Sequence, residues 1–66
     1  MCSNCYSLQE RYGTTVGGLV SAGDAVARSN PTEARNCYTK ALKTLDELGG
    51  CSSCKQELKQ KINLTY

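Results

Sequence analysis

The sequence predicts an all-α fold, either a small antiparallel three-helix bundle or a helical hairpin followed by a third helix. Apolar residues recur at intervals of three and four in three segments, and short breaks that contain glycine or proline separate these segments. No segment alternates apolar and polar residues as a half-buried strand would. Breaks of only two or three residues require neighbouring helices to run antiparallel.

The size of the chain limits how it can be stabilised. Its 66 residues allow one domain, residues 1–66, with few aliphatic side chains and no Phe or Trp. A metal, disulfides or oligomerisation usually supplement so thin a core. The net charge of +2 is too small to indicate nucleic acid binding. With no secretory signal and no apolar run of membrane-spanning length, we expect a cytoplasmic protein without membrane contact, in a reducing compartment where structural disulfides are rare.

The segment 31–48 is the clearest predicted helix. Asn30 is a good N-cap, Pro31 suits the first helical position, and Glu33 stands where a capping-box acid belongs. A glycine pair at positions 49 and 50 is expected to end the helix, because glycine readily adopts the left-handed conformation of a C-cap. The predicted buried stripe consists of Ala34, Tyr38, Ala41, Leu45 and Leu48.

A helix is also predicted before it, from about residue 7 to about residue 28. Four glycines lie inside this segment, and each costs about 1 kcal/mol relative to alanine in a helix. The alternative is a break near residues 13–15 or at the Gly17-Gly18 pair. The residues at helical spacing are Leu8, Tyr12, Thr15, Leu19, Ala22 and Val26.

The last helix is predicted to begin at Ser52 or Ser53. Gln56 is placed to close a capping box on Ser53. Leu58 and Ile62 lie on the helix face that also carries the two cysteines of this segment, so this face is expected to pack inward.

Two Cys-x-x-Cys pairs stand at the starts of the first and last predicted helices. In an antiparallel three-helix fold these starts lie at the same end, so the pairs are expected to meet. Four thiolates in a tetrahedron form a closed structural zinc site. We therefore predict one structural zinc ion, with disulfides, an iron–sulfur cluster or inert thiols as alternatives. The expected ligands are Cys2, Cys5, Cys51 and Cys54, whereas Cys37 is expected to be a buried apolar residue that takes no part.

The side chains that catalysis usually requires are missing from the sequence. There is no histidine, and no acidic pair stands out from the surface charges. A thioredoxin-type Cys-x-x-Cys motif needs a preceding strand in a βαβ unit, which this sequence does not predict. We therefore expect a protein that is not an enzyme, and a thiol–disulfide redox protein is the less favoured alternative.

Small residues recur at intervals of four in the first predicted helix, at Gly13, Gly17 and Ser21. This spacing lets another backbone approach closely, either within the bundle or in a second chain. Because a thin core often recruits a second copy, we expect a homo-dimer or higher oligomer that uses this face. The leading functional interpretation is a non-catalytic module that binds itself and another protein.

The second interpretation is an oligomeric pocket protein that captures a small anionic ligand such as a nucleotide. Basic side chains would bind the phosphates, and a tyrosine would stack on the base. The candidate residues are Arg11, Arg28, Arg35, Lys40, Lys43, Tyr12 and Tyr38.

Overall fold

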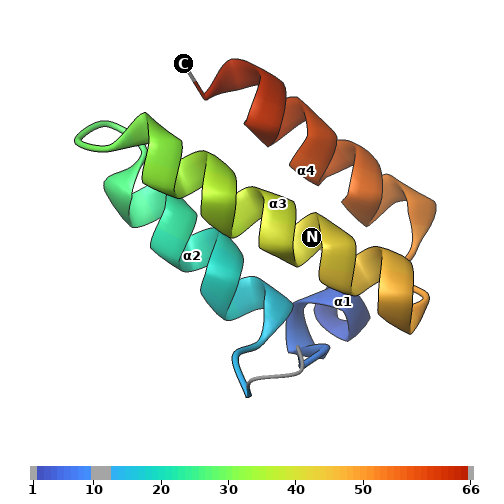
Figure 1. Cartoon of the computed structure of the whole chain (residues 1–66). Coiled ribbons are helices and arrows are strands. Elements are labelled where there is room, and N and C mark those ends of the chain that lie inside the picture. Colours follow the sequence, from blue (N-terminus) through green and yellow to red (C-terminus); the bar gives the residue numbers. More distant parts are fainter. Residues whose placement is uncertain (1, 10–12, 66) are drawn as a thin grey trace.

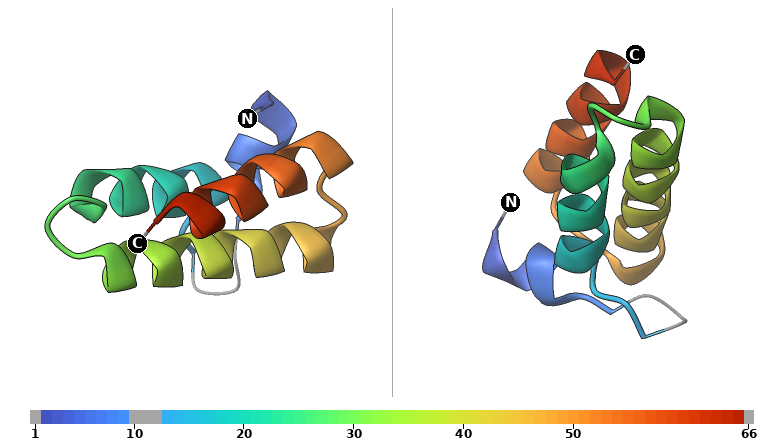
Figure 2. Two further views of the ribbon diagram at one scale, coloured as in Figure 1. Left: turned by 90° about the horizontal axis from the view of Figure 1, so that it is seen from above. Right: turned by 90° about the vertical axis from the view of Figure 1, so that its left-hand side faces the viewer.

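A computed structural model, which describes residues 2–9 and 13–65, confirms the all-helical prediction. Helix α3 runs antiparallel to both α2 and α4, and the short α1 lies near the start of α4 (Figure 1). The additional views in Figure 2 show α2 and α4 lying beside α3. The helices are α1 (Ser3–Ser7), α2 (Val16–Val26), α3 (Pro31–Leu48) and α4 (Ser52–Leu64). Among the described residues, no helix has the length and apolar character that crossing a membrane requires.

Helix α3 has the ends that its local sequence predicts. Asn30 Oδ1 accepts a hydrogen bond of 3.2 Å from the backbone N–H of Glu33, which satisfies a free donor of the first turn. At the other end Gly49 takes the left-handed conformation, with φ of 77°. The predicted stripe is buried over four of its five residues. Leu48 is the exception, because its side chain remains 49% exposed in the last turn.

The predicted continuous helix from residue 7 to residue 28 is wrong. Within it the structure has α2 from residue 16, while α1 ends at Ser7, where the predicted helix was to begin; the described residues between them, 8–9 and 13–15, are not helical, and they include the 13–15 break that the alternative prediction offered. Gly13 has φ of 90°, a left-handed conformation that L side chains rarely adopt. Thr15 then caps α2, because its Oγ1 accepts a 2.9 Å hydrogen bond from the N–H of Gly18. A backbone bond of 2.8 Å from Val16 N–H to the Leu8 carbonyl holds the two helices together.

The buried face of α2 is therefore rotated from the predicted one. Val16, Leu19 and Gly23 are buried, whereas Ala22 is exposed. Thr15 and Val26 are only half-buried, and Tyr12 lies outside the described residues. The apolar spacing correctly indicates the helix over residues 16–26. The same spacing also includes Thr15, which is the N-cap of α2 and lies before the helix.

Two glycines of α2 allow tyrosine rings to lie against the helix backbone. A Cβ atom at Gly23 would lie 2.7 Å from Cε1 of Tyr38, and one at Gly17 would lie 2.5 Å from the ring of Tyr6. Contacts this close exclude any side chain larger than hydrogen unless the ring moves. Packing within the chain therefore explains why the helix tolerates these glycines.

The predicted series of small residues does not form one helical face. Gly13 lies in the turn before α2, Gly17 is buried beneath Tyr6, and Ser21 is exposed. The expectation of self-association through these three residues together does not fit this arrangement.

Helix α4 packs against α3 through Leu58, which is fully buried, and Ile62, which is partly buried. Its first residue is Ser52, as predicted, but its N-cap is Cys51, so the predicted capping box on Ser53 is wrong. Ser53 lies within the first turn and not at the cap position. The hydrophobic core consists of Cys5, Val16, Leu19, Ala34, Tyr38, Ala41, Leu45, Cys54 and Leu58.

A polar contact on one side of this core joins α2, α3 and α4. The Tyr38 hydroxyl donates a 2.5 Å hydrogen bond to Asp24 Oδ1, and Lys61 Nζ lies 3.1 Å from the same oxygen. The Lys61 ammonium group also lies 5.5 Å from the centre of the Tyr38 ring. These contacts fix the rotation of α4 relative to the other two helices.

Candidate metal centre

The two Cys-x-x-Cys pairs occupy equivalent positions in their helices. Cys2 is the N-cap of α1 and Cys51 is the N-cap of α4, with nearly identical backbone angles of −73° and 158° and of −73° and 155°. Cys5 and Cys54 follow three residues later, in the first turn of the same helix. An extended cap residue followed by one helical turn brings the two sulfurs of each pair to one side.

The four cysteine sulfurs come together, which confirms that the two pairs meet. All four Sγ atoms lie within 4.8 Å of one another. The closest pair is Cys51 and Cys54 at 3.0 Å. Cys2 Sγ lies 3.4 Å from Cys54 Sγ, and Cys5 Sγ lies 3.5 Å from Cys51 Sγ. The antiparallel course of α3 produces this meeting, because it returns the chain to the end where α1 lies (Figure 1).

Reciprocal hydrogen bonds join the two pairs. The backbone N–H of Cys2 donates to Cys54 Sγ at 3.5 Å, and the backbone N–H of Cys51 donates to Cys5 Sγ at 3.4 Å. In each case the N–H of a cap residue reaches the second sulfur of the opposite pair, so the centre has approximate two-fold symmetry. Such donors stabilise negative charge on sulfur, and thiolates are the form in which cysteine binds a metal.

The spacing of the sulfurs fits a single tetrahedral metal ion. Zinc–sulfur bonds of about 2.3 Å place the four sulfurs about 3.8 Å apart. Three of the sulfur pairs lie between 3.4 and 3.6 Å, within a few tenths of an ångström of this spacing, whereas Cys51 and Cys54, at 3.0 Å, would have to move apart by about 0.8 Å. All five cysteines are free, and these separations are much longer than a disulfide bond of about 2.05 Å. A multi-iron cluster would need wider separations, because its cysteines bind different iron atoms.

The sulfurs differ in how readily they ionise. The hydrogen bond between their side chains lowers the pKa of Cys51 to about 6 and raises the pKa of Cys54 to about 12. The backbone N–H of Cys5 lowers the pKa of Cys2. At Cys5 the N–H of Cys51 acts in the same direction, but burial and the thiols of Cys2 and Cys51 outweigh it and raise the pKa. The raised pKa values of the two buried sulfurs favour the thiol form, and a divalent ion beside them would favour the thiolate.

One side of the centre faces solvent and the other belongs to the core. Cys5 and Cys54 are each 2% exposed and are members of the hydrophobic core, whereas Cys2 and Cys51 are exposed. A cavity of about 210 Å³ opens beside the exposed pair. Its walls are Cys2, Asn4, Cys5, Leu8, Leu48, Gly49, Gly50 and Cys51. Cys37 lies on α3, half-buried, and is not part of the cluster.

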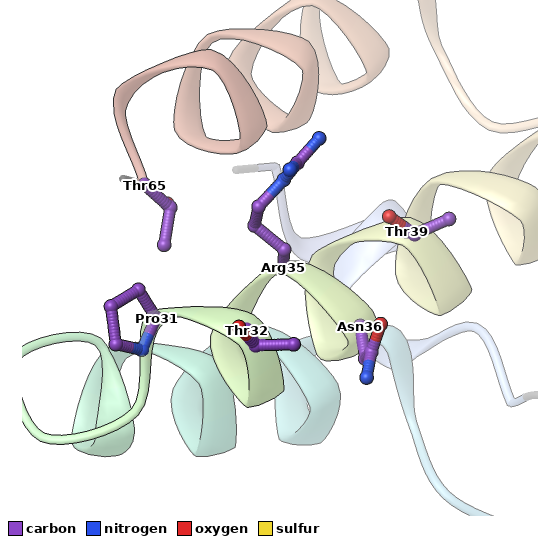
Figure 3. A pocket seen from close by; sticks show the side chains of 6 residues that line it. All are labelled: Pro31, Thr32, Arg35, Asn36, Thr39 and Thr65. Carbon is purple, nitrogen blue, oxygen red and sulfur yellow. The ribbon is translucent and has the colours of Figure 1, made fainter.

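The described residues that were predicted to hold an anionic ligand do not line a common pocket. Arg35 alone among them lines a pocket of about 330 Å³, where it extends from α3 toward α4 among threonine and asparagine side chains (Figure 3). Arg28 is exposed in the turn after α2, and Lys40 and Lys43 are exposed on α3 outside this pocket. Arg11 and Tyr12 lie outside the described residues.

Tyr38 is not available to stack on a base. Its side chain is 3% exposed, and its hydroxyl is bonded to Asp24. The sequence correctly places Tyr38 on a buried stripe, and that structural role excludes the ligand-binding role. The anionic-ligand interpretation therefore loses Tyr38 as a stacking residue, and the rest of it stays a prediction.

A groove between α2 and α4 was not anticipated from the sequence. It has a volume of about 340 Å³ and a partly apolar floor, and it is called the α2/α4 groove below. Tyr6 from α1 forms one wall, with its side chain 51% exposed. The only signal in the sequence was Gly17, because its missing side chain allows Tyr6 to take this place. The groove is lined by Tyr6, Val20, Ser21, Asp24, Glu57, Leu58 and Lys61.

Comparisons of the chain with protein-family models, with curated protein sequences and with solved structures find no match, so a proposal of function has to start from the geometry described above.

Proposed function

We propose that this chain is a non-catalytic, protein-binding module whose fold is held together by a structural zinc ion. The ligands are Cys2, Cys5, Cys51 and Cys54. The observation that supports this best is the meeting of four sulfurs within 4.8 Å, with a backbone N–H from each pair directed at the opposite pair. Inert thiols have no need of such an arrangement, whereas a four-thiolate zinc site requires it.

A metal with four cysteine ligands has a structural role. The thiolates complete a tetrahedron and leave no position for substrate or water, so the ion does not act as a catalyst. Zinc is favoured because it accepts four thiolates in this geometry and undergoes no redox chemistry. A single iron ion would occupy a similar cage, and metal analysis distinguishes the two.

The α2/α4 groove is the proposed binding surface. Val20 and Leu58 contribute its apolar floor, and Tyr6 offers an exposed ring at its edge. Tyrosine is favoured at interfaces because an apolar ring carries a polar hydroxyl. The metal centre holds α1 against α4 and therefore sets the position of Tyr6. Zinc binding and partner binding are in this way linked through α1.

The first proposed partner is a second copy of the chain. The core is small, and the groove exposes apolar side chains that a second copy would cover. Other proteins are the alternative occupants. A reducing, cytoplasmic setting accords with the proposal, since the four thiols must remain reduced to bind the ion.

Metal analysis of protein purified without added zinc tests the proposed site. One zinc per chain is expected in the wild type, with strong loss in Cys51→Ser. Cys37→Ser is the matched control, because it removes a thiol that lies outside the cluster. Stoichiometric zinc in Cys51→Ser, or its absence from the wild type, would contradict the site.

Sedimentation analysis tests the binding surface. Ser21→Arg places a large charged side chain at an exposed position in the groove and should shift a dimer toward monomer. Ser29→Arg, in the exposed turn after α2, is the control. Gly17→Leu is a poor probe, because its side chain would collide with Tyr6. A wild-type chain that sediments as a monomer at high concentration would remove the self-association proposal.

A further inference from the structure

We propose that the cysteine centre is also an oxidation site, at which the Cys51 sulfur attacks a hydroperoxide and Cys54 then completes a disulfide within α4. The inference rests on the proposed metal site, and it adds a reaction that the structural role of zinc does not include. Its consequence is release of the metal and loss of the contact between α1 and α4.

Access to the sulfurs is unequal. Cys5 and Cys54 are 2% exposed, while Cys2 and Cys51 are exposed. The cavity of about 210 Å³ has Cys2, Cys5 and Cys51 in its wall, and of these three only Cys5 is buried, so the cavity gives a small oxidant room beside the two accessible sulfurs. Reaction therefore begins at one of these two cysteines and not at their buried partners.

Of the two accessible sulfurs, Cys51 has the closest partner for a disulfide. Its Sγ lies 3.0 Å from Cys54, 3.5 Å from Cys5 and 3.6 Å from Cys2. Cys51 and Cys54 also belong to the same end of one helix, so their sulfurs can close to about 2.05 Å without moving one helix relative to another. The accessible Cys2 lies 3.4 and 3.6 Å from the two sulfurs of α4, and a disulfide to either would draw α1 and α4 together.

The reaction balances in two steps. The thiolate of Cys51 attacks one peroxide oxygen, an S–O bond forms, the O–O bond breaks, and the hydroxide that leaves takes a proton to become water. The thiolate of Cys54 then attacks this sulfenic sulfur, an S–S bond forms, the S–O bond breaks, and the second hydroxide is protonated to water. Two electrons pass from the sulfurs to the peroxide, which is the oxidant, and the metal keeps its charge.

Loss of these two ligands undoes the metal link between α1 and α4. Zinc held by only two thiolates binds far more weakly, so the ion leaves. The contacts of α1 with α2 remain, and they include Tyr6 on Gly17 and the backbone bond from Val16 to Leu8. A disulfide between α1 and α4 would instead keep these two helices joined. The identity of the two cysteines that pair therefore decides whether α1 is separated from α4.

Treatment of the zinc-loaded wild-type protein with hydrogen peroxide tests the inference. A zinc-sensitive dye follows the metal, free thiols are then alkylated, and peptide mapping identifies the disulfide. The expected result is one zinc released per chain, a mass decrease of about 2 Da in the peptides that carry Cys51 and Cys54, and alkylation of Cys37. A main product that links Cys2 to Cys51, zinc retained after peroxide, or release without any disulfide would overturn the proposal.

Two further measurements separate this inference from the proposed metal site. Metal content is determined before oxidant is added, so an absence of zinc counts against the metal site alone. Peptide mapping of the metal-free chain then still shows whether Cys51 pairs with Cys54. Hydrogen exchange is the second readout. Oxidation should remove the protection of the Tyr6 and Leu8 amides, which donate to carbonyls of the first turn, and unchanged protection would contradict release of α1.

Discussion

Removal of zinc should lower the melting temperature of this chain by a large and calculable amount. A ligand that binds only the folded state stabilises it by about 4.1 kcal/mol when free ligand is 1,000 times its Kd. For a domain of this length, each kcal/mol shifts the melting temperature by about 4–8 °C. Chelation in such a zinc buffer should therefore lower the melting temperature by about 15–30 °C.

The structure indicates why this loss matters. A chain of 66 residues has a total stability of about 3–10 kcal/mol. The core contains no side chain larger than Tyr38, and two of its members, Cys5 and Cys54, are proposed zinc ligands. Helix α1 has 5 residues, too few to be stable without tertiary contacts. The metal-free chain is therefore expected to lose α1 first and to approach global unfolding near physiological temperature.

Thermal melts followed by circular dichroism, with zinc and then with a chelator, measure this effect. Cys37→Ser should show the same shift as the wild type, and Cys51→Ser should melt at the same temperature with or without zinc. If the wild-type melting temperature does not change after metal analysis has verified removal, the cluster does not stabilise the fold and the structural role of the ion is wrong.

Three other measurements check separate parts of the structure. Gly23→Ala should lower the free energy of unfolding in urea by about 1–2 kcal/mol. The collision of the new methyl group with the Tyr38 ring outweighs the roughly 1 kcal/mol that alanine gains over glycine in a helix, and a more stable variant would refute that contact. Burial and the Asp24 carboxylate raise the pKa of Tyr38 to about 12, so one tyrosine should titrate late by ultraviolet absorbance. Because this pKa exceeds the ordinary value of 10.0, the associated stability is complete below pH 10 and is lost as the pH rises toward 12. Nucleotides should shift the melting temperature by less than about 1 °C, and a clear increase would restore the anionic-ligand interpretation.

The parts of the fold that depend on neighbouring residues were predictable from the sequence. Asn30, Pro31 and Gly49 determine where α3 begins and ends through contacts within one turn of chain. The convergence of the two cysteine pairs was predictable for a different reason. Short connections force an antiparallel course, and that course alone brings the starts of the first and last helices to one end.

The parts that depend on distant contacts were not predictable. Residues 7–28 have helical spacing throughout, and spacing alone does not distinguish one helix from two. The start of α2 depends on Gly13 and on the Thr15 cap. The packing of Tyr6 on Gly17 then holds α1 against α2. The reciprocal N–H bonds of the cysteine centre and the burial of Tyr38 against Gly23 likewise require knowledge of which helices touch.

The dependence of the α2/α4 groove on α1 can be separated from zinc binding by Tyr6→Ala. This change removes one wall of the groove, and all four sulfur ligands remain. Because the Tyr6 side chain is 51% exposed, its loss should affect folding much less than loss of a buried residue would. If the groove is the self-association surface and the Tyr6 ring is an anchor of that interface, its truncation should cost about 2 kcal/mol or more, which is a rise of about 30-fold in the dimer Kd.

Sedimentation and metal analysis on the same Tyr6→Ala preparation decide the matter. If Tyr6→Ala binds one zinc per chain but associates more weakly than the wild type, Tyr6 belongs to the interface. The role of the metal centre is then to position Tyr6. Thr39→Ala, at an exposed position on α3 outside the groove, is the control for truncation at the surface. Association as tight as that of the wild type would count against the groove as the self-association surface, because Tyr6 is the large exposed side chain that this surface offers.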